Sequence, residues 1–279
     1  MIRIFSDLHY GDRATALKTL TSLTPLFEGA SQIVLNGDTM DTRPSLDTRP
    51  TVQARQEVTA FFAKYAPPTT WLTGNHDPDI SENHAMELAD RRVFVTHGDI
   101  LFENLVPWGR DAAILSERVA VELAQLSTHE RDLLDCQLLA FRRAAAGVSQ
   151  RHQSERNPLK YALGFAADTI WPPLRILRVL KAWRETPHRA VRLLQRHALP
   201  AKVLVMGHTH RLGAILTPSG TLVVNTGSFC PPTSGGVVDV SENHLVLRRV
   251  HRKGTEFRFG ETLAEFALAR VSDAETLPA

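Results

Sequence analysis

The chain contains 279 residues, of which 43% are hydrophobic and 22% are charged. These proportions exclude an intrinsically disordered chain and suffice for one large domain, or for a domain with a sizeable insertion. The formal net charge of +2 favours no class of partner by itself. The two cysteines, Cys136 and Cys230, are far apart, which argues against a disulfide framework and against a cysteine zinc site.

Neither a targeting signal nor a membrane span is expected. The first residues lead directly into Asp7, without the basic and apolar regions of a signal peptide. No stretch of about 18 apolar residues, the length that a membrane-spanning helix requires, occurs in the chain. We therefore expect a cytoplasmic protein.

Short apolar runs bounded by turn residues recur along the chain and are predicted to be buried strands. These runs are Ile2–Phe5, Ile33–Leu35, Thr70–Leu72, Val93–Val95 and Val203–Met206. Between the first of them, Ala14–Phe27 and Val52–Tyr65 carry apolar residues at the three- and four-residue spacing of helices. This alternation predicts an α/β fold built in layers.

Residues 104–202 have a different character, and we call them the insertion. Four helices are predicted there: Ala112–Leu126, Glu130–Ala146, Leu174–Trp183 and Pro187–His197. Asn157-Pro158 and Trp171-Pro172-Pro173 mark breaks between helices. The sequence thus predicts a helical insertion between two strands of a core that comprises residues 1–103 and 203–260.

The C-terminal part is rich in short β-type segments separated by Pro, Gly, Ser and Asn. The predicted strands are Ala214–Leu216, Leu222–Asn225, Gly236–Val240 and His244–Val250, expected to form an antiparallel run. Residues 261–279 are expected to form a short helix and a polar tail.

Polar motifs follow the predicted core strands. In chain order they are Asp-x-His, Gly-Asp-x-x-Asp, Gly-Asn-His-Asp, His-Gly-Asp and Gly-His-Thr-His. The residues in them with metal-binding side chains are Asp7, His9, Asp38, Asn75, His97, His208 and His210. In open α/β sheets ligands gather at the carboxyl ends of strands, so these side chains are expected to share one crevice.

Such a set of side chains requires a cation. Ionised carboxylates packed together would repel one another and would be costly to desolvate, and a divalent ion reverses that balance. Oxygen and imidazole ligands without a thiolate suit manganese best, with iron or zinc as alternatives. A single motif is weak evidence because a lone histidine is usually structural, but five in order at strand ends indicate a metal site.

The ordered motifs resemble those of the calcineurin-like metallophosphoesterases over residues 1–103 and 203–250. The resemblance implies a layered β-sandwich flanked by helices and a dinuclear metal-dependent hydrolase of phosphomonoesters or phosphodiesters. One ion would be held by Asp7, His9, Asp38 and His210. The other would be held by Asp38, Asn75, His97 and His208, with Asp38 bridging. A hydroxide shared by the two ions would attack phosphorus.

The same resemblance gives two more residues a role. His76 would act as a general acid on the leaving oxygen, and Asp41 would orient it. The alternative for Asp41 is a side chain that only caps a turn. Asp77 and Asp99 are expected to support backbone turns.

The insertion is expected to select the substrate, since the core only supplies the chemistry. It contains 16 lysines and arginines against 9 aspartates and glutamates, whereas the rest of the chain contains 16 against 21. After Pro173 one helical face carries Ile176, Leu177, Val179, Leu180 and Trp183, and the other carries Arg175, Arg178, Lys181 and Arg184. We name Arg175, Arg178 and Arg184 as candidate substrate-binding residues. Such a helix either lies on an anionic membrane surface or packs its apolar face into the core.

Several alternatives stay open. UDP-2,3-diacylglucosamine diphosphatases of this superfamily carry a helical, lipid-binding insertion at the same place, which suggests a lipid pyrophosphate as substrate and contact with the inner face of a membrane. That family has Arg at position 76, and an aromatic residue with Glu where this chain has Thr39-Met40-Asp41. A non-catalytic scaffold, as in the retromer subunit of similar fold, is disfavoured by the full ligand set. A nuclease would need aromatic residues that stack on bases, so nucleic acid is a less favoured partner than a phosphorylated small molecule or lipid.

Overall fold

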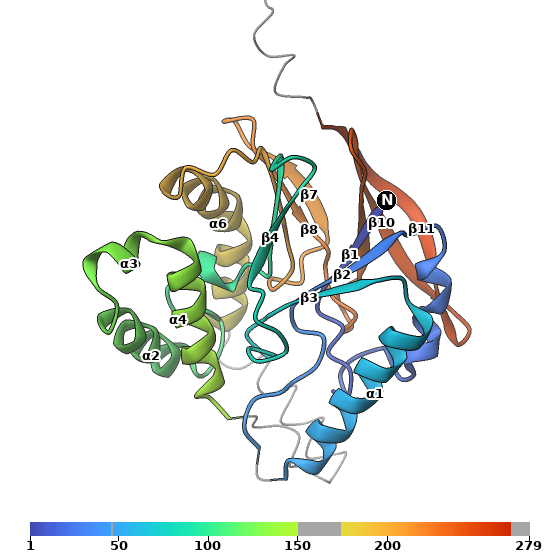
Figure 1. Ribbon diagram of the computed structural model, residues 1–279, viewed down its shortest axis with the longest axis horizontal. Coiled ribbons are helices and arrows are strands. Elements are labelled where there is room, and N and C mark those ends of the chain that lie inside the picture. The colour runs from blue at the N-terminus through green and yellow to red at the C-terminus, as the bar shows by residue number, and fades with distance from the viewer. Residues whose placement is uncertain (46, 150–173, 269–279) are drawn as a thin grey trace, which may run out of the picture.

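The computed structural model describes residues 1–45, 47–149 and 174–268. Within these residues, two mixed β-sheets pack face to face between two groups of helices (Figure 1). One sheet has the strand order β11 (Glu256–Ala267), β10 (His244–Lys253), β9 (Gly236–Val240), β1 (Ile2–Phe5), β2 (Gln32–Asn36) and β3 (Thr69–Leu72). The other has the order β4 (Ala85–Leu88), β5 (Val93–Thr96), β6 (Val203–Met206), β8 (Leu222–Asn225) and β7 (Gly213–Leu216). The predicted α/β layered fold is confirmed.

Each sheet contains three neighbouring parallel strands. Strands β1, β2 and β3 pair in parallel in one sheet, and β5, β6 and β8 do so in the other. Parallel strands covered on both faces are apolar throughout, which is why these segments read as short apolar runs. Alternate residues point to opposite faces, so Ile4 packs between the sheets while Phe5 faces the helical layer.

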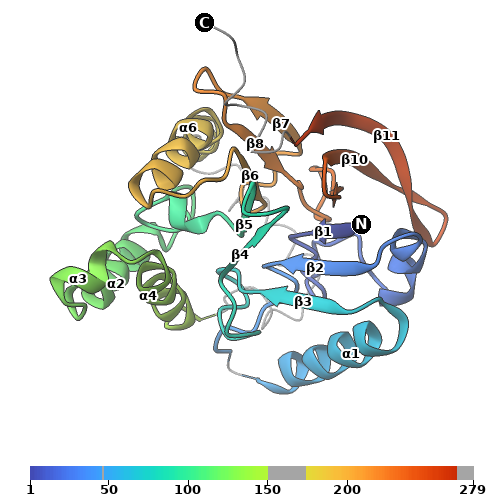
Figure 2. The ribbon, with the colours of Figure 1, turned by 45° about the horizontal axis from the view of Figure 1, so that its top comes forward.

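The helices lie on the outer faces of the two sheets (Figure 2). The 3₁₀ helix η1 (Leu20–Phe27) and α1 (Arg49–Tyr65) cover the six-stranded sheet. The five-stranded sheet is covered by the helices α2 (Ala112–Ala124), α4 (Leu134–Ala146) and α6 (Leu174–Arg196), with η2 (Asp99–Leu101) and the short α3 (Thr128–Asp132) beside them. The described part of the insertion is therefore a helical layer on the core.

Helix boundaries differ from the prediction in three places. Of the segment predicted as a helix from Ala14, only η1 is helical. The helix predicted over Glu130–Ala146 is two helices, because Leu133 has an extended backbone with φ −81° and ψ 125°. The two helices predicted after the insertion's prolines are the single helix α6, which continues through Pro187.

Pro187 lies inside α6, and the carbonyl that its missing N–H would leave without a donor has another partner. Proline lacks the N–H that would reach the carbonyl of Trp183. The guanidinium of Arg211 donates to that carbonyl oxygen instead, at 3.3 Å. One residue earlier, the Thr186 hydroxyl donates to the carbonyl oxygen of Ala182 at 2.8 Å.

The C-terminal segments also differ from the prediction. They do not form one antiparallel run, because β7 and β8 join the five-stranded sheet, where β8 is parallel to β6. The short helix expected from residue 261 is wrong: Glu256–Ala267 is a strand that pairs along the length of β10. The expected tail over residues 269–279 and the breaks near Pro158 and Pro172 lie outside the described residues. No described helix combines the length and apolar composition that crossing a bilayer demands.

Candidate metal centre

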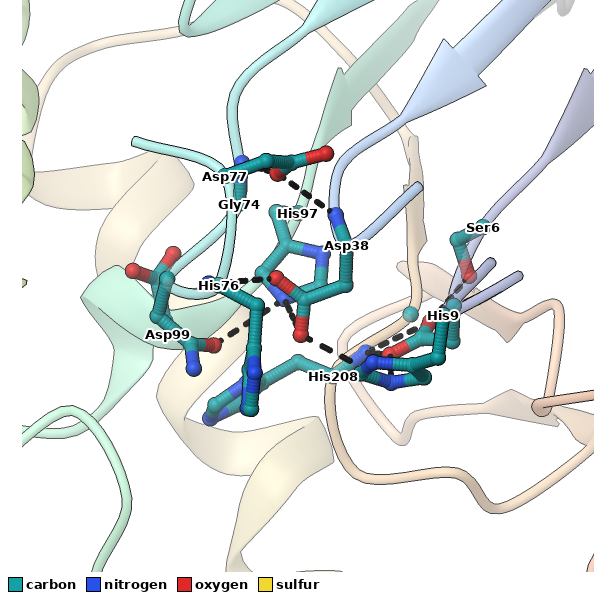
Figure 3. A network of polar contacts seen from close by, with 12 residues as sticks. Ser6, His9, Asp38, Gly74, His76, Asp77, His97, Asp99 and His208 are labelled. Atoms are coloured by element: carbon teal, nitrogen blue, oxygen red, sulfur yellow. Dashed lines mark hydrogen bonds and ion pairs between the residues drawn. The ribbon is translucent and has the colours of Figure 1, made fainter. Parts of the chain in front are cut away.

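The seven predicted ligands meet at one end of the sandwich. Asp7 and His9 follow β1, Asp38 follows β2, Asn75 follows β3, His97 follows β5, and the Gly-His-Thr-His motif follows β6. These are the parallel strands of both sheets, so their carboxyl ends deliver the side chains to a common place (Figure 3). All of the ligand side chains except that of His210 are buried.

Asp7, His9 and His210 form the first group. The Nε2 atoms of the two histidines lie 3.4 Å apart, and that of His210 lies 3.0 Å from Oδ1 of Asp7. Two imidazole nitrogens bound to one tetrahedral ion at about 2.0–2.1 Å would be separated by about 3.4 Å. The spacing of these nitrogens therefore fits a shared cation.

Asp38, Asn75, His97 and His208 form the second group. Nε2 of His97 lies 3.3 Å from Oδ2 of Asp38 and 3.2 Å from Oδ1 of Asn75. The rings of His97 and His208 are 5.2 Å apart. The same Oδ2 atom of Asp38 lies 3.9 Å from Nε2 of His9 in the first group. Asp38 is thus the side chain that links the two groups.

Five of these residues have backbone conformations that L-amino acids seldom adopt. The left-handed φ values are 52° for Asp7, 47° for His9, 53° for Asp38, 65° for His208 and 56° for His210. Each such residue costs about 1–3 kcal/mol and persists only where the surrounding structure enforces it. Strain concentrated on these side chains is typical of a functional site.

Glycines in the motifs allow the loops to approach one another closely. A Cβ atom on Gly74 would lie 2.2 Å from Oδ1 of Asp38, and one on Gly207 would lie 2.1 Å from Oδ2 of Asp7. A side chain at either position would displace a candidate ligand.

The electrostatics of the site favour a cation. Burial lowers the pKa of both His9 and His208 to about 4, so each imidazole is neutral and free to bind a metal at neutral pH. Burial alone would also lower the pKa of His97, but the Asp38 carboxylate raises it to about 10. The Asp38 carboxylate therefore stabilises a positive charge next to it. A divalent ion would supply that charge in place of the proton on His97.

Backbone carbonyls fix which histidine nitrogen faces the centre. Nδ1 of His97 donates to the carbonyl oxygen of Asn36 at 3.0 Å, and Nε2 of His208 donates to that of Leu105 at 2.8 Å. The other nitrogen of each ring is left for a metal, as is usual for metal-binding histidines. These carbonyls carry no sequence signal and were not predicted.

Comparison with known proteins agrees with this geometry. The model of a protein family described as calcineurin-like phosphoesterase matches residues 1–212. The chain belongs to this family. Its members bind divalent metals, and the ligand groups described above provide a place for them.

The comparison with solved structures found matches of low sequence identity and low TM-score. Vacuolar protein sorting 29 from Cryptosporidium parvum is 13% identical with a TM-score of 0.44, over 95% of this chain and 97% of that chain. A dimetal phosphatase from Danio rerio is 15% identical with a TM-score of 0.44, over 94% and 98%. A cold-active protein-tyrosine phosphatase from a psychrophilic Shewanella species is 17% identical with a TM-score of 0.43, over 94% and 80%. No curated protein matches the chain.

His76 lies beside the candidate ligands and is held by Asp41. Its ring is 5.0 Å from that of His9, and its Nδ1 atom lies 3.1 Å from Oδ2 of Asp41. Burial and then Arg43 act to lower the pKa of His76, but Asp38 and Asp41 outweigh them and raise it. A histidine with a raised pKa, oriented through Nδ1, can deliver a proton from Nε2.

Arg43 is a functional neighbour that the sequence did not reveal. Its guanidinium donates to both carboxylate oxygens of Asp41, at 3.0 Å and 2.7 Å, and its Nη2 atom lies 3.0 Å from Nδ1 of His76. Asp41 also accepts the backbone N–H of Arg43 at 3.1 Å. Asp41 therefore both shapes the turn and contacts His76.

The two other acidic residues of the motifs have different surroundings. Asp77 accepts the backbone N–H groups of Asp38, Thr39 and Gly74 at 2.7–2.8 Å, as expected for a residue that supports turns. The expectation was wrong for Asp99, whose side chain forms a buried ion pair with Arg142 of α4.

The candidate substrate-binding arginines lie on the first half of α6. Arg178 and Arg184 are exposed, and Arg175 is half-buried with one guanidinium nitrogen that has no hydrogen-bond partner among the described residues. Trp183 of the same helix donates its indole N–H to the carbonyl oxygen of Thr209 at 2.8 Å. That contact joins α6 to the loop that carries His208 and His210.

Proposed function

We propose that this protein is a dinuclear metal-dependent hydrolase of phosphomonoesters or phosphodiesters. The observation that supports it most is the convergence of Asp7, His9, Asp38, His97 and His210 on one place, with His76 within reach of it. In this proposal Asp7, His9, Asp38 and His210 hold one ion, and Asp38, Asn75, His97 and His208 hold the other. Divalent ions, with manganese first among them, would supply an activated water and neutralise the phosphoryl oxygens.

The chain itself contributes orientation and a proton. Nδ1 of His76 donates to Asp41, which is itself held by Arg43, so the Nε2 atom of His76 is the one that can protonate the leaving oxygen. The left-handed loop residues fix the ligands in place before a substrate arrives, which reduces the cost of ordering them in the reaction. A site that holds cations suits a substrate whose reacting group carries negative charge.

A substrate panel tests this proposal. The purified protein with added Mn²⁺ should hydrolyse a nitrophenyl phosphate monoester, a bis-nitrophenyl diester, or both, and their ratio defines the bond preference. The Asp38→Asn variant, which should lose both ions, is the matched control for contaminating phosphatases, which would show the same activity in both preparations. Absence of activity toward monoesters, diesters and pyrophosphates would contradict the proposal and favour a non-catalytic scaffold.

A second candidate is a pyrophosphate hydrolase that acts on a lipid-linked substrate at the cytoplasmic face of a membrane. Ile176, Leu177 and Leu180 are 48%, 60% and 49% exposed, and they share the first half of α6 with the exposed Arg178 and Lys181. An ordinary core-packed helix would bury those apolar side chains. An exposed apolar and basic segment suits contact with an anionic lipid surface.

A cavity in the insertion adds to this second candidate. It has a volume of about 820 Å³ and lies between α2, α4 and α6, with the apolar side chains of Leu123, Phe141 and Leu193 among its lining. Arg192 and Arg196 also line it. Apolar walls with cationic side chains suit a ligand that has both a hydrocarbon part and an anionic group.

Charge reversal on α6 distinguishes the two candidates. Replacing Arg175, Arg178 and Arg184 with Glu should reduce binding to anionic liposomes and raise KM for a lipid pyrophosphate. Hydrolysis of a small nitrophenyl ester should stay unchanged, because it needs only the metal centre and His76. The matched control is Arg143→Glu, an exposed arginine on α4. Equal liposome binding by the triple variant and the wild type would exclude the lipid candidate.

A further inference from the structure

One buried arginine reaches from the insertion into the core beside the metal centre. Arg142 lies on α4, and its side chain is only 2% exposed. Its Nη2 atom donates to Oδ1 of Asp99 at 2.8 Å, and its Nη1 atom donates to Oδ2 of the same carboxylate. Its Nε atom donates to the hydroxyl of Thr73 at 2.7 Å. All three contacts cross from the insertion to the core.

The two partners of Arg142 sit next to two candidate ligands of one ion. Thr73 follows β3 and precedes Asn75 by two positions, and Asp99 follows His97 by two positions. Nε2 of His97 lies 3.2 Å from Oδ1 of Asn75. A single rigid guanidinium therefore joins the two loops whose side chains must converge on the same ion.

Attachment of α4 to the core does not require this ion pair. Leu138 and Phe141 of α4 already pack in the apolar cluster beneath the insertion. Replacing a buried ion pair with apolar side chains is often neutral or stabilising, so its presence is weak evidence for a role in stability. A planar guanidinium with donors in a fixed fork is, however, well suited to set the distance between two loops.

We propose that Arg142 is a positioning residue that holds Asn75 and His97 at the spacing their ion requires. The affinity for that ion then depends on how the insertion packs against the core. This inference rests on the proposed dinuclear centre. Residues that support metal ligands from outside the coordination sphere typically contribute about 10–100-fold to metal affinity. Asp7, His9 and His210 have no described contact with Arg142, so the ion that they hold should be little affected.

Titration of Mn²⁺ into the metal-free protein tests the inference without measuring activity. Arg142→Lys keeps the positive charge but removes the fork, and it should weaken one of two binding steps by about 10–100-fold. Asn75→Ala identifies that step, because Arg142→Lys must weaken the same one. The matched control is Arg143→Lys, the same substitution at the neighbouring, exposed position of α4, which should bind both ions like the wild type.

A second variant covers the case in which Arg142→Lys does not fold. Thr73→Val keeps the shape of the side chain and the Asp99 pair, removes the acceptor of Nε, and should weaken the same step to a smaller extent. The inference would be overturned if the folded variants bound both Mn²⁺ ions with wild-type affinity. It would also be overturned if both binding steps were weakened equally. A wild-type protein that binds fewer than two ions would instead contradict the proposed dinuclear centre on which the inference depends.

Discussion

At the level of single residues, His76 contacts both a supporting carboxylate and the candidate ligands. Its Nδ1 atom lies 3.1 Å from Oδ2 of Asp41, and its backbone N–H donates to Oδ1 of Asp38. One of its ring nitrogens also lies within 4.8 Å of ligand atoms of His9 and Asp38, and we assign it to the leaving group because Asp41 orients it. His76→Ala should therefore leave both ions bound while turnover falls by about 10²–10⁴-fold, the usual contribution of a general acid. The loss should be smaller for a substrate with a good leaving group such as nitrophenolate. Kinetics on esters of graded leaving-group pKa check this, and an equal loss across the series would refute the role.

The shared position of Asp38 leads to a second prediction for single side chains. One oxygen of Asp38 lies within reach of His9 and His97, which belong to different ligand groups. Asp38→Asn should therefore lower the content of both ions, whereas His9→Ala should lower the content of one. Metal analysis of the purified variants measures this. If the two variants lose the same amount of metal, Asp38 does not bridge.

Among the secondary-structure elements, α6 is divided between two environments. In its second half Leu193 is buried in the core beneath the insertion, whereas Leu177 in its first half is 60% exposed. Leu193→Ala should reduce the free energy of unfolding by about 2–5 kcal/mol, because it removes buried methyl groups and leaves a cavity. The same substitution at Leu177 should change it by less than about 0.5 kcal/mol. Chemical denaturation measures both, and similar losses would show that the first half is packed as well.

Sequence patterns predicted these elements to different degrees. The parallel strands were predicted closely because each is an apolar run that ends in a polar motif. Strand β4, with the sequence Ala-Met-Glu-Leu, was missed since it is short, lies at a sheet edge and carries a charge. Where α6 continues through Pro187, Arg211 of another segment donates to the carbonyl oxygen of Trp183. Long-range contacts of this kind leave no local signal.

In the molecule as a whole, the topology of the two sheets makes neighbours of site residues that are distant in sequence. The seven candidate ligands could be named because each lies in a motif at a strand end, and the sheets place these side chains at one end of the sandwich. The residues that hold the ligands were not predicted: Arg43 and Arg142 belong to no motif, and the Leu105 carbonyl has no side-chain identity. Local sequence motifs identify the candidate metal ligands, whereas the residues that position those ligands come from segments distant in sequence.

The central claim is that a pair of divalent ions at this centre is required for phosphoester hydrolysis. The most direct test is to remove metal with a chelator, measure hydrolysis of a nitrophenyl phosphate ester, and then titrate Mn²⁺ back while counting bound ions. The account predicts no activity in the metal-free protein, and activity that returns as the second ion binds. Full activity in the metal-free protein, or activity that is complete with one bound ion, would contradict it.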